Sequence, residues 1–321
     1  MKESSKKSIE FRPAQPYRNP SAGRLFQIEG YIIGFVGLLF IIGDQKQDSM
    51  ELLLYGFGAL IGGYYIWFQG RRIASVSAEQ LLLQDKRAPV LFIRSFEDEE
   101  KSYSLSTFYN LIKTVFVDLK FLKRYFQAGA SFWGPVLQLQ FNGLFSKIGP
   151  FIAIGRPGEK IPAMGAARLY VSDNDWKNVI SDFLSRARLI VVLPGTTPGL
   201  RWEINEMKRA IAPQKILFIL PEKEGDYASF CSWVNKELPV KMPEVIPGGR
   251  FIALDDQWKP YEMGGYSMLL DTLEPYLKRN GIRKSDFSLT YRLINNSWLS
   301  AIIITLFLFV LLFGVAGILF P

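Results

Sequence analysis

Three long apolar stretches constrain this chain more than any other feature of its sequence. They cover residues 25–43, 51–68 and 298–320. Each approaches the roughly 20 apolar residues that a helix needs to span a bilayer. We therefore predict a transmembrane hairpin of two helices over residues 25–68 and a C-terminal transmembrane helix over residues 298–320. The alternative for the first two stretches is a buried hydrophobic hairpin inside a soluble domain.

Lysine and arginine residues predict how these spans are oriented. Six of them precede the first span: Lys2, Lys6, Lys7, Arg12, Arg18 and Arg24. The short loop at 44–50 contains only Lys46, whereas Arg71 and Arg72 directly follow the second span. Positive charge stays on the cytoplasmic side of membrane proteins. The sequence thus predicts a multi-pass protein of the cell membrane, with the bilayer as a partner and with its N-terminus and residues 69–297 in the cytoplasm.

The remaining segments divide the chain into further units. Residues 1–24 are polar and basic, and they read as a disordered cytoplasmic tail. Residues 69–87 read as a helical connector, and residues 88–281 as the main cytoplasmic domain. The net charge of +8 is concentrated next to the spans, and no aromatic-basic motif accompanies it. We therefore attribute this charge to the membrane and expect no nucleic-acid partner.

Short apolar runs alternate with helical patterns through the main domain. Runs typical of buried strands occupy residues 88–96, 149–158, 188–195, 215–221 and 249–256. Helical spacing occupies parts of 103–146 and most of 173–187, 199–211, 227–238 and 266–281. Five buried strands that alternate with helices predict an α/β fold, with a parallel sheet covered by helices on both faces. In such sheets, ligands bind at the carboxyl ends of the strands.

Two absences from the composition exclude whole classes of chemistry. The chain contains no histidine, which rules out Ser-His-Asp and Cys-His catalysis and any histidine-ligated metal. Its one cysteine, Cys231, allows neither an internal disulfide nor a thiolate cluster. We expect no metal and no cofactor.

The loops after the first two strands supply the first candidate binding residues. "RSFEDEE" begins with Arg94, Ser95 and Phe96, and a cation at the end of a strand can meet a phosphate or a carboxylate. "GRPGE" begins with Gly155 and Arg156, and its Pro-Gly pair is typical of a turn. The structural alternatives are an ion pair for Arg94 and a plain turn for "GRPGE". Arg168, a little further on, is either another anion contact or a surface residue.

The loop after the third strand leads into a helix that carries two carboxylates. "TTPGLRWEINE" contains Thr197, Trp202, Glu203 and Glu206. Small residues in the loop allow a ligand to approach the backbone. The carboxylates could bind ribose hydroxyls or stabilise a sugar cation during cleavage of a glycosidic bond. The alternative is that they only complement the helix dipole.

Taken together, these motifs resemble the TIR (Toll/interleukin-1 receptor) domain superfamily, especially a divergent group in bacterial membrane proteins. "VLFIRSFEDEE" is similar to the family's first box, and "GRPGE" to its second. "SRARLIVVLP" followed by "TTPGLRWEINE" resembles the strand and helix that carry the family's glutamate. The resemblance covers about residues 88–280 and implies a flavodoxin-like strand order of 2-1-3-4-5. Pro194, Gly199 and the long insertion between the first two strands depart from the pattern.

The resemblance implies two functions and leaves a third open. Enzymatic members cleave the nicotinamide–ribose bond of NAD⁺, here as substrate, with one glutamate. Counting four residues from Trp202 gives Glu206, whereas matching the glutamate that precedes an aliphatic residue gives Glu203, which is nearer the loop and is the preferred candidate. Arg94 and Arg156 would then hold phosphates, while Phe96 or Trp202 stacks on a base, in bacterial defence or signalling. The second function is a non-catalytic module that assembles at the membrane by self-association. The third is a sensor that binds NAD⁺ or a related nucleotide without turnover.

Overall fold

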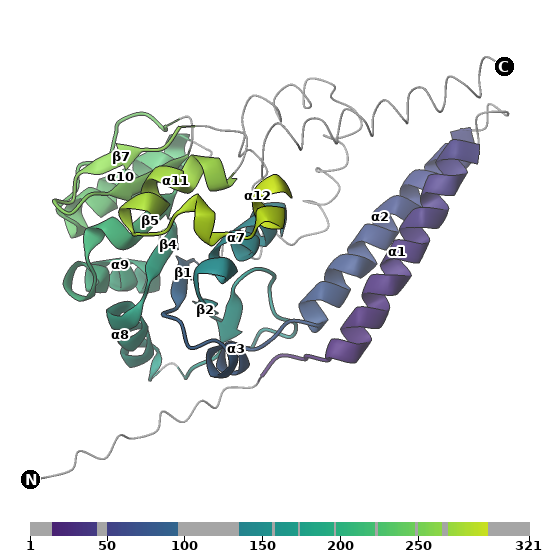
Figure 1. Cartoon of the computed structure of the whole chain (residues 1–321), viewed down its shortest axis with the longest axis horizontal. Helices are drawn as coiled ribbons and strands as arrows, with labels where there is room; N and C mark the ends of the chain where they lie inside the picture. Colours follow the sequence, from purple (N-terminus) through teal and green to yellow (C-terminus); the bar gives the residue numbers. More distant parts are fainter. Residues whose placement is uncertain are drawn as a thin grey trace, which may run out of the picture.

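A helical hairpin and an α/β body make up the part of the chain that the computed structural model describes (Figure 1). The description covers residues 15–43, 50–95, 135–155, 158–172, 174–195, 197–221, 224–247, 250–264 and 269–294. The predicted C-terminal span and the helical patterns before residue 135 lie outside these residues.

The body is built on one mixed sheet of seven strands in the order β3-β2-β1-β4-β5-β6-β7. The strands are β1 Val90–Arg94, β2 Phe151–Ile154, β3 Ala167–Leu169, β4 Leu189–Leu193, β5 Ile216–Ile219, β6 Phe251–Leu254 and β7 Pro260–Glu262. The first five pair in parallel, whereas β6 and β7 are antiparallel to their neighbours.

The sheet confirms the predicted α/β class and corrects its details. The five predicted strands correspond to β1, β2, β4, β5 and β6, and they lie in the order second, first, third, fourth, fifth. The prediction of a wholly parallel, five-stranded sheet was wrong. β6 runs antiparallel to β5, and the three-residue edge strands β3 and β7 were not foreseen. A continuously apolar run is buried whichever way it points, so its composition does not reveal its direction.

Helices cover both faces of this sheet, as the sequence predicted. The helices of the body are α3 Ala78–Gln84, α7 Pro135–Ile148, α8 Trp176–Arg186, α9 Pro198–Ala210, η2 Pro213–Lys215, α10 Glu224–Glu237, α11 Leu269–Arg279, η3 Lys284–Asp286 and α12 Leu289–Ile294. α3, α8, α9 and α10 contribute to the core on one face, and α7 and α11 to the core on the other. Alternate residues of β1 divide between the two cores: Leu91 and Ile93 enter the first, and Val90 and Phe92 the second.

The hairpin consists of two antiparallel 24-residue helices, α1 Pro20–Gly43 and α2 Met50–Ile73. Glycines at seven-residue spacing face each other along its seam in three pairs: Gly23 with Gly70, Gly30 with Gly63, and Gly37 with Gly56. A Cβ added to the α1 member of each pair would lie only 2.5 to 2.6 Å from the carbonyl oxygen of its partner. The backbones of the two helices are therefore in direct contact, which larger residues would prevent.

Hydrogen bonds tie the foot of the hairpin, where α1 begins and α2 ends, to the body. The Tyr17 backbone amide donates to the Lys160 carbonyl of the body over 2.9 Å. Within the hairpin itself, the Asn19 amide donates to the Ile73 carbonyl at the end of α2 over 3.0 Å. Arg72 donates to the carbonyls of Ile161 and Pro162, each over 2.9 Å. The Tyr17 bond holds the segment before α1 against the body, and α1 starts at Pro20, within the range 1–24 that the sequence assigns to the tail.

Only one helix within the described ranges is long and apolar enough to cross a bilayer by itself, over Pro20–Phe40. Its apolar side chains are mostly exposed, with Tyr31 at 65% and Phe35 at 62%. α2 is less apolar because it includes Glu51, Arg71 and Arg72. A multi-pass arrangement therefore stays a prediction.

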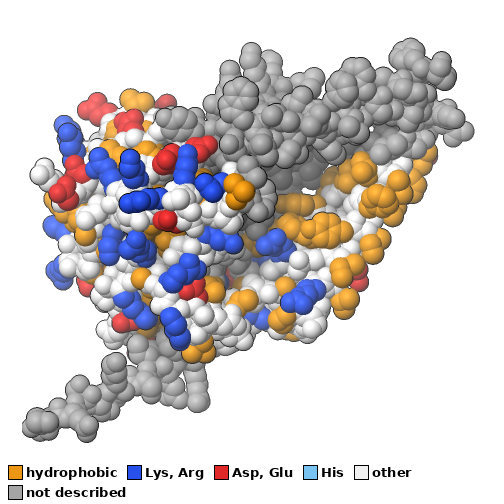
Figure 2. Space-filling model, viewed as in Figure 1, with side chains coloured by type: hydrophobic (Ala, Val, Ile, Leu, Met, Phe, Trp, Pro, Cys, Tyr) orange, Lys and Arg blue, Asp and Glu red, His pale blue; other side chains and the backbone are white. Residues whose placement is uncertain are grey.

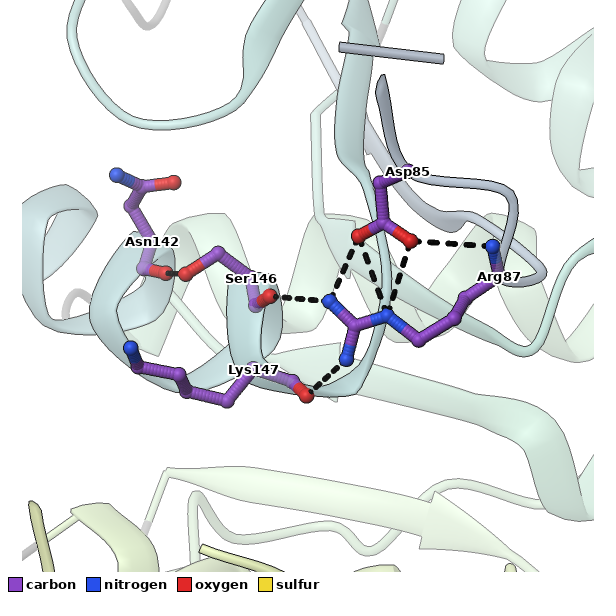
Figure 3. Close-up of polar contacts among 5 residues, drawn as sticks. All are labelled: Asp85, Arg87, Asn142, Ser146 and Lys147. Carbon is purple, nitrogen blue, oxygen red and sulfur yellow. Dashed lines mark hydrogen bonds and ion pairs between the residues drawn. The ribbon is translucent and has the colours of Figure 1, made fainter. Parts of the chain in front are cut away.

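Arg87 joins the connector before β1 to the last turn of α7 (Figure 3). Its guanidinium forms an ion pair with Asp85 over 2.6 Å and donates to the carbonyls of Ser146 and Lys147. A cation at this point satisfies carbonyls that the end of a helix leaves unpaired. Hydrogen bonds from Arg87 lower the pKa of Asp85, so the stabilisation from this pair is present near neutral pH and lost as the pH falls through that pKa.

We expect Arg87→Ala to destabilise the body by about 1 kcal/mol, because it removes charge-assisted hydrogen bonds at a half-exposed site. The measurement is the unfolding midpoint of the full chain in detergent. Lys86→Ala removes the same charge from the neighbouring exposed residue and is the matched control. Equal midpoints for the two variants would show that the contacts of Arg87 add nothing to stability.

Candidate active site

The site that the sequence predicted lies where the sheet reverses its strand order. From β1 the chain passes to β2 and β3 on one side, and it returns to β4 and β5 on the other. β1 and β4 pair in register from Val90↔Leu189 to Arg94↔Leu193, so the tips of these two strands are adjacent. Open α/β sheets bind ligands beside such a switch point, at the carboxyl ends of the strands.

Arg94 is the last residue of β1 and Ser95 directly follows it at this switch point, and both are buried, at 6% and 2% exposure. The Arg94 Nη1 donates to the carbonyl of Ile154, the last residue of β2, over 3.2 Å. The guanidinium also lies 5.6 Å from the centre of the Phe92 ring. Arg94 thus places a positive charge among the tips of the first two strands, in surroundings from which water is largely removed.

Gly155, directly after β2, has a structural reason to be glycine. Its amide donates to the Leu169 carbonyl over 2.8 Å, and a Cβ at this position would collide with the Tyr170 ring. The Tyr170 hydroxyl donates to the Glu159 carboxylate over 2.6 Å, so the second predicted loop is bound back onto the body. The sequence interpretation missed this bond because nothing in the local pattern pairs the two residues. Arg156 and Phe96 lie outside the described residues.

Glu203 occupies a position on α9 that would normally be apolar. The buried residues of this helix are Leu200, Ile204 and Met207, and Glu203 falls at the remaining place of the same stripe, three residues after Leu200 and four before Met207. Burial raises the pKa of Glu203 to about 8, and the positive charge of Arg94 acts in the opposite direction. α9 therefore directs this carboxyl toward the sheet and within electrostatic reach of Arg94.

Glu206 and Trp202 lie on a different side of α9. The Ser181 hydroxyl of α8 donates to the Glu206 carboxylate over 3.2 Å. The Trp202 ring packs edge-on against Trp176, with centroids 4.9 Å apart, next to the Lys177 ammonium group. The structure places Glu203 within electrostatic reach of Arg94 but directs Glu206 and Trp202 toward α8. The two glutamates that the sequence left as alternatives are thus separated by which face of α9 they occupy.

Thr197 is the N-cap residue of α9, with extended backbone angles, and its carbonyl accepts the Arg201 amide over 3.1 Å. Its side chain forms no capping hydrogen bond. The hydroxyl therefore lies at the start of the helix that carries Glu203, without a role in holding that helix.

No group of three or more acidic or cysteine side chains that could hold a metal occurs in the described part of the chain. No family model, curated protein or solved structure matches this chain. The interpretation of the site accordingly depends on its own geometry and on the motifs in the sequence.

Stability should depend on pH through Glu203. Its folded pKa of about 8 exceeds the ordinary value of 4.5, so between these values the folded chain retains a proton that the unfolded chain releases. Folding stability contributed by the neutral carboxyl is complete below pH 4.5 and is lost as the pH rises through about 8. Glu203→Gln keeps the site neutral at all pH values. We expect its free energy of unfolding to exceed that of wild type by about 2 kcal/mol at pH 9. This value is smaller than the whole pKa difference would give, because the residue is partly open to water.

The measurement is denaturant unfolding of both chains at pH 6 and pH 9, with Glu206→Gln as the matched control. The stability difference between Glu203→Gln and Glu206→Gln should grow with pH. A difference that stays constant would mean that the Glu203 carboxyl is already ionised at pH 6.

Proposed function

We propose that this protein is a membrane-anchored, TIR-like enzyme that cleaves the nicotinamide–ribose bond of NAD⁺. Water would attack the anomeric carbon as the bond to nicotinamide breaks, giving nicotinamide, ADP-ribose and a proton. A hydroxyl or ring nitrogen of the same nucleotide in place of water would give a cyclic product. The reaction needs no metal and no further cofactor.

The observation that carries the proposal is that Glu203, in the buried stripe of α9, lies within electrostatic reach of Arg94 at the switch point of the sheet. As nicotinamide leaves, positive charge develops on the ribose, and a nearby carboxylate stabilises that charge. The same carboxylate can accept hydrogen bonds from the ribose hydroxyls. A carboxyl with a strongly raised pKa beside a cation is typical of catalytic sites rather than of surface glutamates. The cationic substrate would itself favour ionisation of Glu203.

Arg94 supports the recognition of a phosphorylated substrate. A guanidinium at the tip of a central strand can form paired hydrogen bonds with the oxygens of a diphosphate. Thr197 stands at the N-terminus of α9, where backbone amides and the helix dipole also favour anions. In this arrangement the diphosphate lies near the tips of β1 and β2, and the ribose lies under α9.

The hairpin supports the anchoring part of the proposal. Its outward surface is apolar along much of α1. The first residue of α1, Pro20, and the last residue of α2, Ile73, both lie at the end of the hairpin next to the body. Arg71 and Arg72 follow the apolar part of α2, as expected of a cytoplasmic boundary. We infer that the hairpin inserts into the cell membrane and holds the body in the cytoplasm, with the segment at 298–320 as a third span.

A second candidate function, a non-catalytic assembly module, is favoured by one observation. The side chains at the tip of β1 are almost completely buried, and Arg94 already contacts the Ile154 carbonyl. A site packed in this way suits a domain that acts through its outer surface, by self-association or by docking a partner. A nucleotide sensor would use the same site as the enzyme but without turnover.

The test is to incubate the purified full chain in detergent micelles and in lipid nanodiscs with NAD⁺ and to quantify nicotinamide by chromatography. The enzyme proposal expects release that increases with protein concentration and with incubation time. NAD⁺ that binds, by isothermal calorimetry, without nicotinamide release would support the sensor. Neither binding nor release in either preparation would leave the assembly module as the better description.

A further inference from the structure

We propose that a cavity at the foot of the hairpin binds the phosphate headgroup of an anionic phospholipid. The cavity has a volume of about 500 Å³, in the range of small-molecule sites. It lies between α1, α2, α7 and the segment before and within β3. The polar side chains that line it are Gln27, Arg71, Ser75, Asn142, Ser146 and Arg168. We refer to it as the foot cavity.

The foot cavity lies at the height expected of lipid headgroups. Tyr31, Tyr64 and Trp67 form an aromatic cluster near the foot, with the Tyr64 and Trp67 rings stacked 5.7 Å apart. Such aromatic residues mark the boundary between hydrocarbon and headgroups. Arg71 follows Trp67 by one helical turn, about 6 Å along the axis, and its guanidinium lies 5.3 Å from the centre of the Trp67 ring. Headgroups occupy a layer of about this depth on each side of the hydrocarbon core.

The charge of the lining suits a phosphate. Arg71 and Arg168 both line the foot cavity, and no Asp or Glu is among the lining residues that the structure describes. Arg168 is 1% exposed on β3, so this arginine is not the surface residue that the sequence left open. The Ser75 hydroxyl is buried and has no hydrogen-bond partner within the described chain, which provides a neutral donor for a phosphate oxygen. Figure 2 shows lysine and arginine side chains where the body meets the hairpin.

The walls of the foot cavity are held in place without a ligand. Arg72 fixes the segment before β3 through the carbonyls of Ile161 and Pro162, and the Arg18 guanidinium donates to the Arg168 carbonyl over 3.4 Å. Arg87 holds the last turn of α7, the helix whose Asn142 and Ser146 also line the cavity (Figure 3). A preformed site of this kind avoids most of the ordering cost of binding. Basic pockets between membrane helices on the cytoplasmic side are a recurrent form of headgroup recognition.

This inference depends on the membrane insertion of the hairpin but not on NAD⁺ cleavage. The experiment uses the full chain in non-ionic detergent and follows its thermal unfolding midpoint with added short-chain phosphatidylglycerol, phosphatidylcholine or inorganic phosphate. We expect phosphatidylglycerol to raise the midpoint, phosphatidylcholine to have little effect, and inorganic phosphate to act only at far higher concentration. If inorganic phosphate raised the unfolding midpoint at the same concentration as phosphatidylglycerol, the lipid would be overturned as the source of the phosphate.

Three variants locate the effect. Arg71→Gln should weaken the response to phosphatidylglycerol roughly fivefold or more, because it removes one of the two lining cations. Ser146→Phe fills the cavity from the α7 side without altering a charge and should abolish the response. Arg24→Gln removes the same charge as Arg71→Gln from an exposed position at the same end of the hairpin, outside the lining, and should respond as wild type does.

Two results would overturn the proposal: no lipid-dependent shift in the wild-type chain, or an equal loss of response in Arg24→Gln and Arg71→Gln. Flotation of the wild-type chain with phosphatidylcholine vesicles tests membrane insertion separately. Failure to float would remove the hairpin anchor from the proposed function and would also overturn the lipid headgroup as the occupant of the foot cavity, whereas NAD⁺ cleavage by the body would be unaffected by that result.

Discussion

Glu203→Gln should lower the rate of nicotinamide release from NAD⁺ by at least about 100-fold, because it removes the charge that opposes the developing ribosyl cation. The glutamine has nearly the same size and retains the ability to hydrogen-bond to ribose hydroxyls. Substrate binding should therefore change less than the rate. Glu206→Gln is the matched control. It makes the same change on the same helix, but the wild-type Glu206 carboxylate accepts a hydrogen bond from Ser181 on α8 and so points away from the site. We expect the rate of nicotinamide release by Glu206→Gln to stay within about threefold of the wild-type rate.

The measurement is kcat/KM for nicotinamide release across pH 6 to pH 9. With a Glu203 pKa of about 8 in the free protein, wild-type kcat/KM should rise with pH up to that value, because the ionised form is the active one. Equal loss of activity in both variants would mean that α9 is disturbed as a whole. Equal activity in both variants and wild type would remove Glu203 from the mechanism.

Gly63→Leu should separate the two helices of the hairpin. A Cβ at Gly63 would lie 2.6 Å from the Gly30 carbonyl oxygen and 2.6 Å from the Gly34 amide nitrogen, both of which are backbone atoms. No change of side-chain rotamer can relieve such a contact. We expect a cost of about 3 kcal/mol, which the chain can avoid only by moving α1 and α2 apart.

Gly62→Leu is the matched control on the neighbouring residue. Nothing lies within 4 Å of a Cβ at Gly62, so this change should be neutral or slightly stabilising, because leucine favours a helix more than glycine does. Hydrogen exchange of α1 and α2, measured by mass spectrometry on the full chain in detergent, reports the separation. Faster exchange in both variants would indicate that the hairpin depends on its glycines for flexibility rather than for close contact.

The positions of the main strands and helices of the body were readable from the sequence, because each follows from local apolar spacing. β1, β4 and β5 fall inside the predicted apolar runs, α8 falls inside its predicted helical pattern, and α9 begins one residue before its pattern. The direction of β6 and the existence of β3 were not readable. A strand of three residues such as β3, which includes Arg168, has too few positions to form a pattern.

The region of the candidate site could be predicted from the sequence, but the arrangement of side chains within it could not. The carboxyl ends of parallel strands gather ligand-binding loops, so Arg94 and the start of α9 could be assigned to one region in advance. The choice between Glu203 and Glu206 needs the face of α9 that packs on the sheet. The stripe of Leu200, Ile204 and Met207 already contains part of that information, because Glu203 falls within it. The bond between Tyr170 and Glu159 had no such signal.

By itself, the sequence determined the apolar stretches, the α/β class, the absence of histidine chemistry and the residues proposed for the site, all of which follow from residue type and local spacing. Only the tertiary structure decided that Arg94 approaches Glu203, that paired glycines bring α1 and α2 into contact, and that Arg71 and Arg168 line one cavity. These are contacts between residues distant in the chain. Their geometry is set by how the whole body packs, and local spacing carries no record of it.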